Sequence, residues 1–76
     1  MAINIREFAN RFADEYEFLY EHQDRVAGYG EAVRAFDEFF PRHREFVMEF
    51  VRYRGDCVTS DREAAAFMFA LDAMVA

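Results

Sequence analysis

The sequence predicts an all-α fold: a compact single-domain bundle of about four short helices, with the C-terminal helix central. Apolar residues recur every three or four positions over long stretches, the spacing of a buried helix side. Helix caps and glycines separate these stretches. The last stretch is apolar around almost its whole circumference, as in a helix covered on all sides. We therefore expect one domain, residues 1–76, built around its last helix.

The first helix is predicted near residues 5–27. Asn4 is its expected N-cap, Glu7 stands at the third helical position as in a capping box, and Gly28 is its expected end. Phe18 falls outside the apolar stripe, so we expect it to be exposed. The residues of the stripe are Ile5, Phe8, Ala9, Phe12, Tyr16, Leu19, Tyr20, Gln23 and Val26.

Two shorter helices are predicted near residues 31–40 and 41–54. Gly28 and Gly30 flank an aromatic residue and permit a tight turn with positive φ angles. Pro41 has no amide hydrogen and restrains Phe40, so a break or sharp kink is expected there, with Pro41 opening the next helix. The predicted inward residues of the earlier helix are Ala32 or Val33, Phe36, Phe39 and Phe40. Those of the later helix are His43, Phe46, Val47, Phe50, Val51 and part of Tyr53.

The fourth helix is predicted near residues 61–75. Ser60 and Glu63 have capping-box spacing, and Asp61 adds negative charge at the positive end of the helix dipole. The apolar run that follows is shorter than the ~20 residues of a membrane span, so a core or interface helix is expected. Leu71 and Phe69 lie on nearly opposite sides of it. The rest of the bundle, or a second protein, must therefore cover this helix on two sides.

Composition and charge restrict the possible partners. Fifteen acidic residues against nine arginines, with no lysine, give a net charge of -6. This charge disfavours direct binding to nucleic acid and favours a partner protein with a basic surface. The first thirty residues are charged, acid-rich and without an apolar central block, so we expect a cytoplasmic protein without a membrane partner.

The sequence offers no recognisable catalytic or metal-binding motif. It lacks Cys-x-x-Cys, His-Glu-x-x-His and calcium-loop patterns, so neither a metal nor a cofactor is expected. His22 and His43 are the only bases for a nucleophile such as Cys57 or Ser60, and His43 is expected on an apolar side. We therefore predict that the chain is not an enzyme. Cys57 has two interpretations, a small loop residue or a reactive thiol.

An acidic row is predicted on the outer side of the first helix. We use this name for Asp14, Glu17, Glu21 and Asp24, whose spacing of three or four residues places neighbouring carboxylates about 5–6 Å apart. One interpretation is a solvated face that keeps the chain soluble. The other is a surface for a positively charged partner, with Phe18 and Tyr20 near its edges as anchors. Arginines elsewhere are expected to pair locally, as Glu49 with Arg52.

The resulting hypothesis is a non-catalytic, stoichiometric inhibitor or regulator of a nucleic-acid-handling complex. A phage or mobile-element protein that occludes a CRISPR effector or a restriction enzyme fits this description, because its acidic face would occupy arginines and lysines that hold phosphates. One alternative is a homo-oligomeric structural or adaptor protein, such as a homodimer, that self-associates through Phe69 and Met48. The other is a small helix-turn-helix regulator, whose candidate recognition helix after Gly30 is acidic.

Overall fold

The computed structural model describes residues 3–75, and the predicted all-α fold with four helices is confirmed for this range. One short 3₁₀ helix, η1, follows the first α-helix. In chain order the elements are α1 (Ile5–His22), η1 (Gln23–Arg25), α2 (Tyr29–Arg42), α3 (Arg44–Arg54) and α4 (Asp61–Val75). No β-strand occurs within the described residues.

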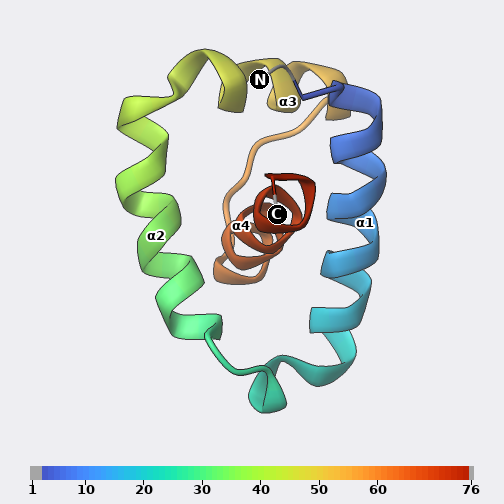
Figure 1. The fold of residues 1–76 in the computed structure, drawn as a ribbon, viewed down its shortest axis with the longest axis vertical. Helices are drawn as coiled ribbons and strands as arrows, with labels where there is room; N and C mark the ends of the chain where they lie inside the picture. The colour runs from blue at the N-terminus through green and yellow to red at the C-terminus, as the bar shows by residue number, and fades with distance from the viewer. Residues whose placement is uncertain (1–2, 76) are drawn as a thin grey trace.

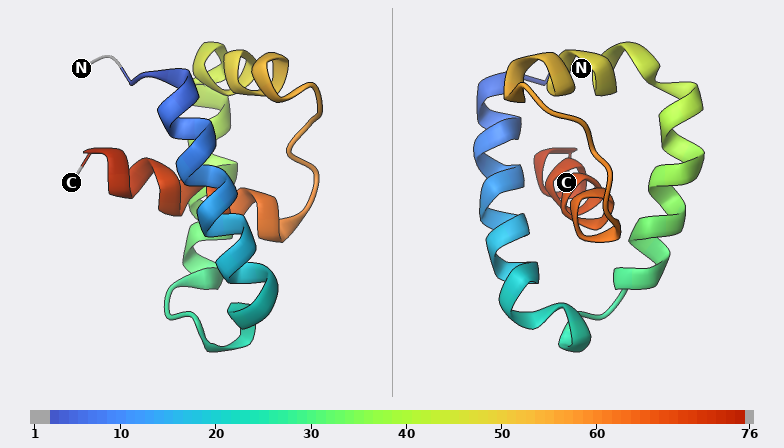
Figure 2. Two further views of the ribbon diagram at one scale, coloured as in Figure 1. Left: turned by 90° about the vertical axis from the view of Figure 1, so that its right-hand side faces the viewer. Right: turned by 180° about the vertical axis from the view of Figure 1, so that it is seen from behind.

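The first three helices form a frame and α4 passes through it. In Figure 1, α1 and α2 are the long sides, α3 lies across one end, and α4 is seen nearly end-on in the middle. The side view of Figure 2 shows α4 crossing α1 and α2. The main neighbours of α4 are α1 and α2, one on each side. The prediction that the C-terminal helix is central is therefore confirmed.

Phe67 of α4 is the centre of the core. Its side chain is 0% exposed. Its ring meets those of Phe8, Phe36 and Phe50 edge to face, with centroids 4.8, 5.2 and 5.3 Å away. Each such contact adds about 0.5–1.5 kcal/mol to the stabilisation that comes from burying the rings. Small buried residues let α1 and α2 approach α4 closely on both sides, because the side chains at a contact set the distance between helices. They are Ala64, Ala65, Ala66 and Ala70.

The first helix ends earlier than predicted. Asn4 does cap α1, since its Oδ1 accepts a hydrogen bond from the Glu7 amide (3.1 Å). However, α1 ends at His22 rather than near Ala27, and η1 follows. Val26 is extended (ψ 119°) and Gly28 is left-handed (φ 84°). These two residues reverse the chain within a few positions, and α2 begins directly after them.

Two further predictions in this region are wrong. Gly30 does not adopt a positive φ, because α2 already begins at Tyr29 and includes it. Tyr20 was placed on the buried stripe but is 66% exposed. At 3.6 residues per turn it points about 100° away from the fully buried Leu19, which puts it at the edge of the stripe.

The predicted break at Pro41 lies two residues later, at His43. Helix α2 continues through Pro41 to Arg42, and His43 leaves the helical region (φ -135°, ψ 46°). Pro41 has no amide hydrogen, so α2 lacks one backbone hydrogen bond in its last turn. The His43 amide donates to the carbonyls of Phe39 (3.0 Å) and Phe40 (3.2 Å), which closes this turn.

His43 and Tyr53 do not face inward as predicted. His43 joins α2 to α3 instead of belonging to α3, so the α3 periodicity does not apply to it. It is exposed, and its ring stacks on Phe39 at 4.3 Å. Tyr53 is also exposed. The other predicted inward residues of α3 are confirmed: Val47 and Phe50 are fully buried, and Phe46 and Val51 are half-buried and pack against the core.

The predicted capping box at the start of α4 is confirmed. Glu63 Oε1 accepts hydrogen bonds from the backbone amides of Thr59 (3.1 Å) and Ser60 (3.2 Å), and Ser60 Oγ accepts one from the Glu63 amide (3.1 Å). Arg54 donates to Glu63 Oε2 (3.4 Å), while its guanidinium lies 4.6 Å from the centre of the Phe12 ring. Burial acts to raise the pKa of Glu63, but these hydrogen bonds together hold the pKa below its ordinary value.

Candidate functional site: the outer face of α1

The acidic row is exposed, but it does not lie on one helix. Asp14, Glu17 and Glu21 are exposed residues of α1, whereas Asp24 belongs to η1. The tighter winding of a 3₁₀ helix places Asp24 out of the α-helical register. Glu17 and Glu21, one turn apart on α1, are therefore the pair in which the predicted helical alignment is preserved.

Most carboxylates of the acidic row have no cationic partner. Within the described chain, no ion pair shorter than 4.0 Å involves Asp14, Glu17 or Asp24. Glu21 Oε2 lies 3.6 Å from Nε2 of His22, and this is an ion pair only when the histidine is protonated. Because these charges remain in water, a partner's arginines and lysines can reach them without displacing an internal contact.

Phe18 lies on one flank of the acidic row and lines an open groove. Its side chain is 52% exposed, and its ring centroid is 4.8 Å from that of His22. Arg25 and Val26 complete the groove, which has a volume of about 430 Å³. The sequence predicted the exposure of Phe18. The groove was missed, because it forms only where α1 gives way to η1.

Tyr20 lies on the opposite flank and already has a partner. The guanidinium of Arg62 lies 4.8 Å from the centre of its ring. Arg62 Nε also donates a hydrogen bond to Gln23 Oε1 (3.2 Å), which ties the first turn of α4 to η1. The two predicted anchors therefore differ: Tyr20 is held by an internal cation–π contact, while Phe18 borders an open groove.

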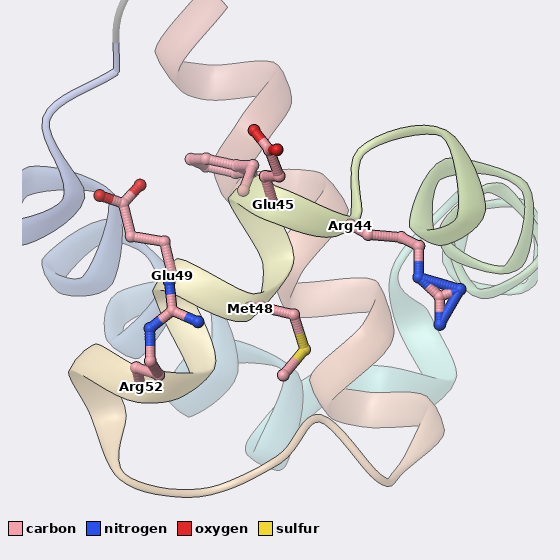
Figure 3. A pocket seen from close by; sticks show the side chains of 6 residues that line it. Arg44, Glu45, Met48, Glu49 and Arg52 are labelled. Carbon is pink, nitrogen blue, oxygen red and sulfur yellow. The ribbon is translucent and has the colours of Figure 1, made fainter.

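The two residues predicted for self-association also differ. Phe69 is half-buried and packs against the core, whereas Met48 on α3 is 41% exposed. Met48 lies in a second open groove, of about 740 Å³, which runs along the outer side of α3 (Figure 3). The side chains that line it are those of Arg44, Glu45, Phe46, Met48, Glu49 and Arg52.

The predicted ion pair between Glu49 and Arg52 is not formed. No pair shorter than 4.0 Å links them in the part of the chain that the structure describes. An exposed pair gains little Coulomb energy in water and loses side-chain entropy. Arg54 on the same helix contacts Asp56 and Glu63, both at 3.4 Å.

The nucleophiles and histidines do not assemble into a catalytic unit. Across residues 3–75, neither histidine hydrogen-bonds to Cys57 or Ser60, and Cys57 is exposed in the loop before α4. No group of three or more His, Cys, Asp or Glu side chains in this range is arranged to hold a metal ion. None of the helices in the described range has the length and apolar character needed to cross a membrane.

The fold and this surface define a small all-α bundle with an acidic outer helix face bordered by aromatic residues. Comparison of the chain with protein-family models, with curated proteins and with solved structures gives no significant match. Its function therefore has to be inferred from its own surface.

Proposed function

We propose that this chain is a non-catalytic protein-binding domain that docks a basic protein surface on the outer face of α1. The observation that carries the proposal is Phe18, half exposed in an open groove, beside Glu17, which has no cationic partner within the described chain. Buried aromatic anchors near the centre of an interface supply much of the binding energy, and charges around them add specificity and association rate.

The two kinds of residue have separate roles in this interface. The carboxylates of Glu17 and Glu21 attract a basic surface and orient it, mainly by increasing the association rate. Burial of the exposed part of Phe18 by a partner supplies hydrophobic stabilisation and slows dissociation. Tyr20, held in place by Arg62, borders the contact with an ordered ring.

The partner class that we favour is a protein that handles nucleic acid. Its phosphate-binding arginines and lysines form the kind of basic surface that a chain of net charge -6 attracts. Binding would occlude these side chains and inhibit the partner stoichiometrically. A phage or mobile-element inhibitor of a CRISPR effector or restriction enzyme is the specific form of this proposal.

The helix-turn-helix alternative is not proposed. Helix α2, which follows the turn at Gly28, exposes Glu31, Asp37 and Glu38. These carboxylates would repel the phosphate backbone at the position of a recognition helix.

The test is binding of the purified full-length chain to purified CRISPR effector complexes and restriction enzymes, with and without their nucleic acid. We expect one of them to bind and to lose affinity for its nucleic acid in proportion to the bound chain. Glu17→Arg/Glu21→Arg and Phe18→Ala should each weaken this binding at least ~10-fold. The control Asp37→Arg/Glu38→Arg changes the net charge equally on α2 and should bind like the wild type.

Binding that survives the α1 variants and about 0.5 M salt would contradict the assignment of the outer face of α1, because salt at that level screens exposed charges beyond a few ångströms. Equal losses for the α1 and α2 variants would show that net charge, rather than this face, is responsible.

A further inference from the structure

The outer side of α3 has a charge pattern that differs from the rest of the chain. Helix α3 lies across one end of the frame, so its outer side faces away from the bundle (Figures 1 and 2). Val47 and Phe50 point inward and are fully buried. The opposite side carries Glu45, Met48, Glu49 and Arg52, which are all exposed. A second molecule can therefore reach the length of α3.

The charged side chains on this side form no ion pairs within residues 3–75, although the guanidinium of Arg44 lies 5.5 Å from the centre of the Phe40 ring. Among the described residues, no ion pair shorter than 4.0 Å involves Arg44, Glu45, Glu49 or Arg52. Two positive and two negative side chains make the surface neutral, although the chain as a whole carries -6. A neutral surface repels a second copy of the chain less than an acidic surface does.

Two of these four charges, those of Glu45 and Arg52, make this surface complementary to itself. Glu45 and Arg52 are seven residues apart, which is two helical turns or about 10.5 Å, so they lie on the same side of α3. If two α3 helices meet in antiparallel orientation, with a two-fold axis near Met48, Glu45 of each copy lies opposite Arg52 of the other. The contact between Glu45 and Arg52 is thus made twice, whereas the two Glu49 side chains face each other near the axis.

We propose that the outer side of α3 binds a second copy of this chain in antiparallel orientation. The central residue is Met48, whose flexible and 41% exposed side chain packs against its own symmetry mate. One helix side is a small interface, so the dimer is weak and forms reversibly as the concentration rises. This inference does not depend on the acidic row, which lies on α1 and η1.

Sedimentation equilibrium of the full-length chain over a range of concentrations tests the proposal. The weight-average mass should rise from 9.0 kDa toward twice that value. Glu45→Arg should raise the dissociation constant of the dimer about 10-fold or more, because it replaces two attractive contacts with two repulsive ones. The charge swap Glu45→Arg/Arg52→Glu should restore association to within about 3-fold of the wild type.

The matched control is Glu38→Arg, which makes the same charge change on exposed α2 and should not weaken association. Circular dichroism verifies that each variant is folded, and Arg52→Glu serves as the single variant if Glu45→Arg is not. A wild-type chain that stays monomeric up to about 1 mM overturns the proposal. So does a charge swap that remains as weak as the single variant, or a dimer that Glu45→Arg leaves unchanged.

Discussion

Helix α4 and the outer face of α1 differ in how far their side chains are buried. The first half of α4 is enclosed by the other helices, and its side chains are fixed by packing around Phe67. The outer face of α1 carries Glu17, which forms no ion pair within the described chain, and Phe18, which is half exposed. The fold therefore requires the buried side chains of α4 for packing. It does not require the side chains on the outer face of α1, which are available for binding.

The largest expected effect is on the α4 side of this comparison. Phe67→Ala should lower the free energy of unfolding by about 3–5 kcal/mol, because it removes a fully buried ring and leaves a cavity. A chain of this size has a small free energy of unfolding. We therefore expect the Phe67→Ala variant to unfold well below the wild-type temperature. Urea denaturation followed by circular dichroism measures the effect.

The matched substitution on α1 is Phe18→Ala, which should change the free energy of unfolding by less than about 0.5 kcal/mol. Phe67→Leu keeps most of the buried volume and provides a milder variant that folds. If Phe18→Ala lowered the free energy of unfolding as much as Phe67→Leu, the distinction between α4 and the outer face of α1 would be incorrect.

The second effect concerns the start of α4 and depends on pH. Hydrogen bonding lowers the pKa of Glu63 in the folded chain, so its stabilisation is complete above the unfolded pKa of about 4.3 and disappears as the pH falls through the folded pKa. At pH 7, Glu63→Gln should therefore cost about 1 kcal/mol. Urea titrations at a series of pH values should show this difference shrinking as the pH falls below the unfolded pKa. A constant difference would mean that the charge of Glu63 is not responsible.

The third effect concerns Arg62, which connects the first turn of α4 to α1 and η1. Arg62→Ala removes the hydrogen bond to Gln23 and the cation–π contact with Tyr20, and should cost about 1 kcal/mol. Thermal unfolding gives the measurement, with Arg34→Ala on the exposed side of α2 as the control. We expect the control to lie close to the wild type. Equal losses for both variants would indicate that the contacts of Arg62 contribute nothing.

The smallest effect has the opposite sign. Glu17→Gln/Glu21→Gln removes like charges one turn apart on α1 and should raise the free energy of unfolding by a few tenths of a kcal/mol. The same double variant should lose partner binding. A clear loss of stability would indicate that these carboxylates are needed by the fold and are not reserved for a partner.

The sequence predicted the fold where local signals agreed with packing. The apolar circumference of residues 64–71 placed α4 in the centre, and the Ser60–Glu63 spacing located its start. The sequence failed where tertiary packing overrides a local preference. Pro41 favours a break, but Phe39 and Phe40 pack against the core and extend α2 past it.

The candidate site was predicted only as a set of exposed residues. Periodicity identified Glu17, Glu21 and Phe18 as outward positions. It did not distinguish Phe18 from Tyr20, because the partner of Tyr20, Arg62, comes from a helix 42 positions later in the chain. The groove beside Phe18 depends on the change from α1 to η1, which a capping analysis does not reveal.

The position of α4 at the centre of the frame has a consequence for biosynthesis. The ribosome makes the three surrounding helices before it makes α4, so their apolar sides lack their main packing partner while they emerge. At typical rates of 5–20 residues per second, the chain spends roughly a second or more in this state. Folding then proceeds once Phe67 leaves the exit tunnel. We expect nascent chains that stop before this residue to be substrates for chaperones and proteases, so that cells accumulate only copies that contain α4.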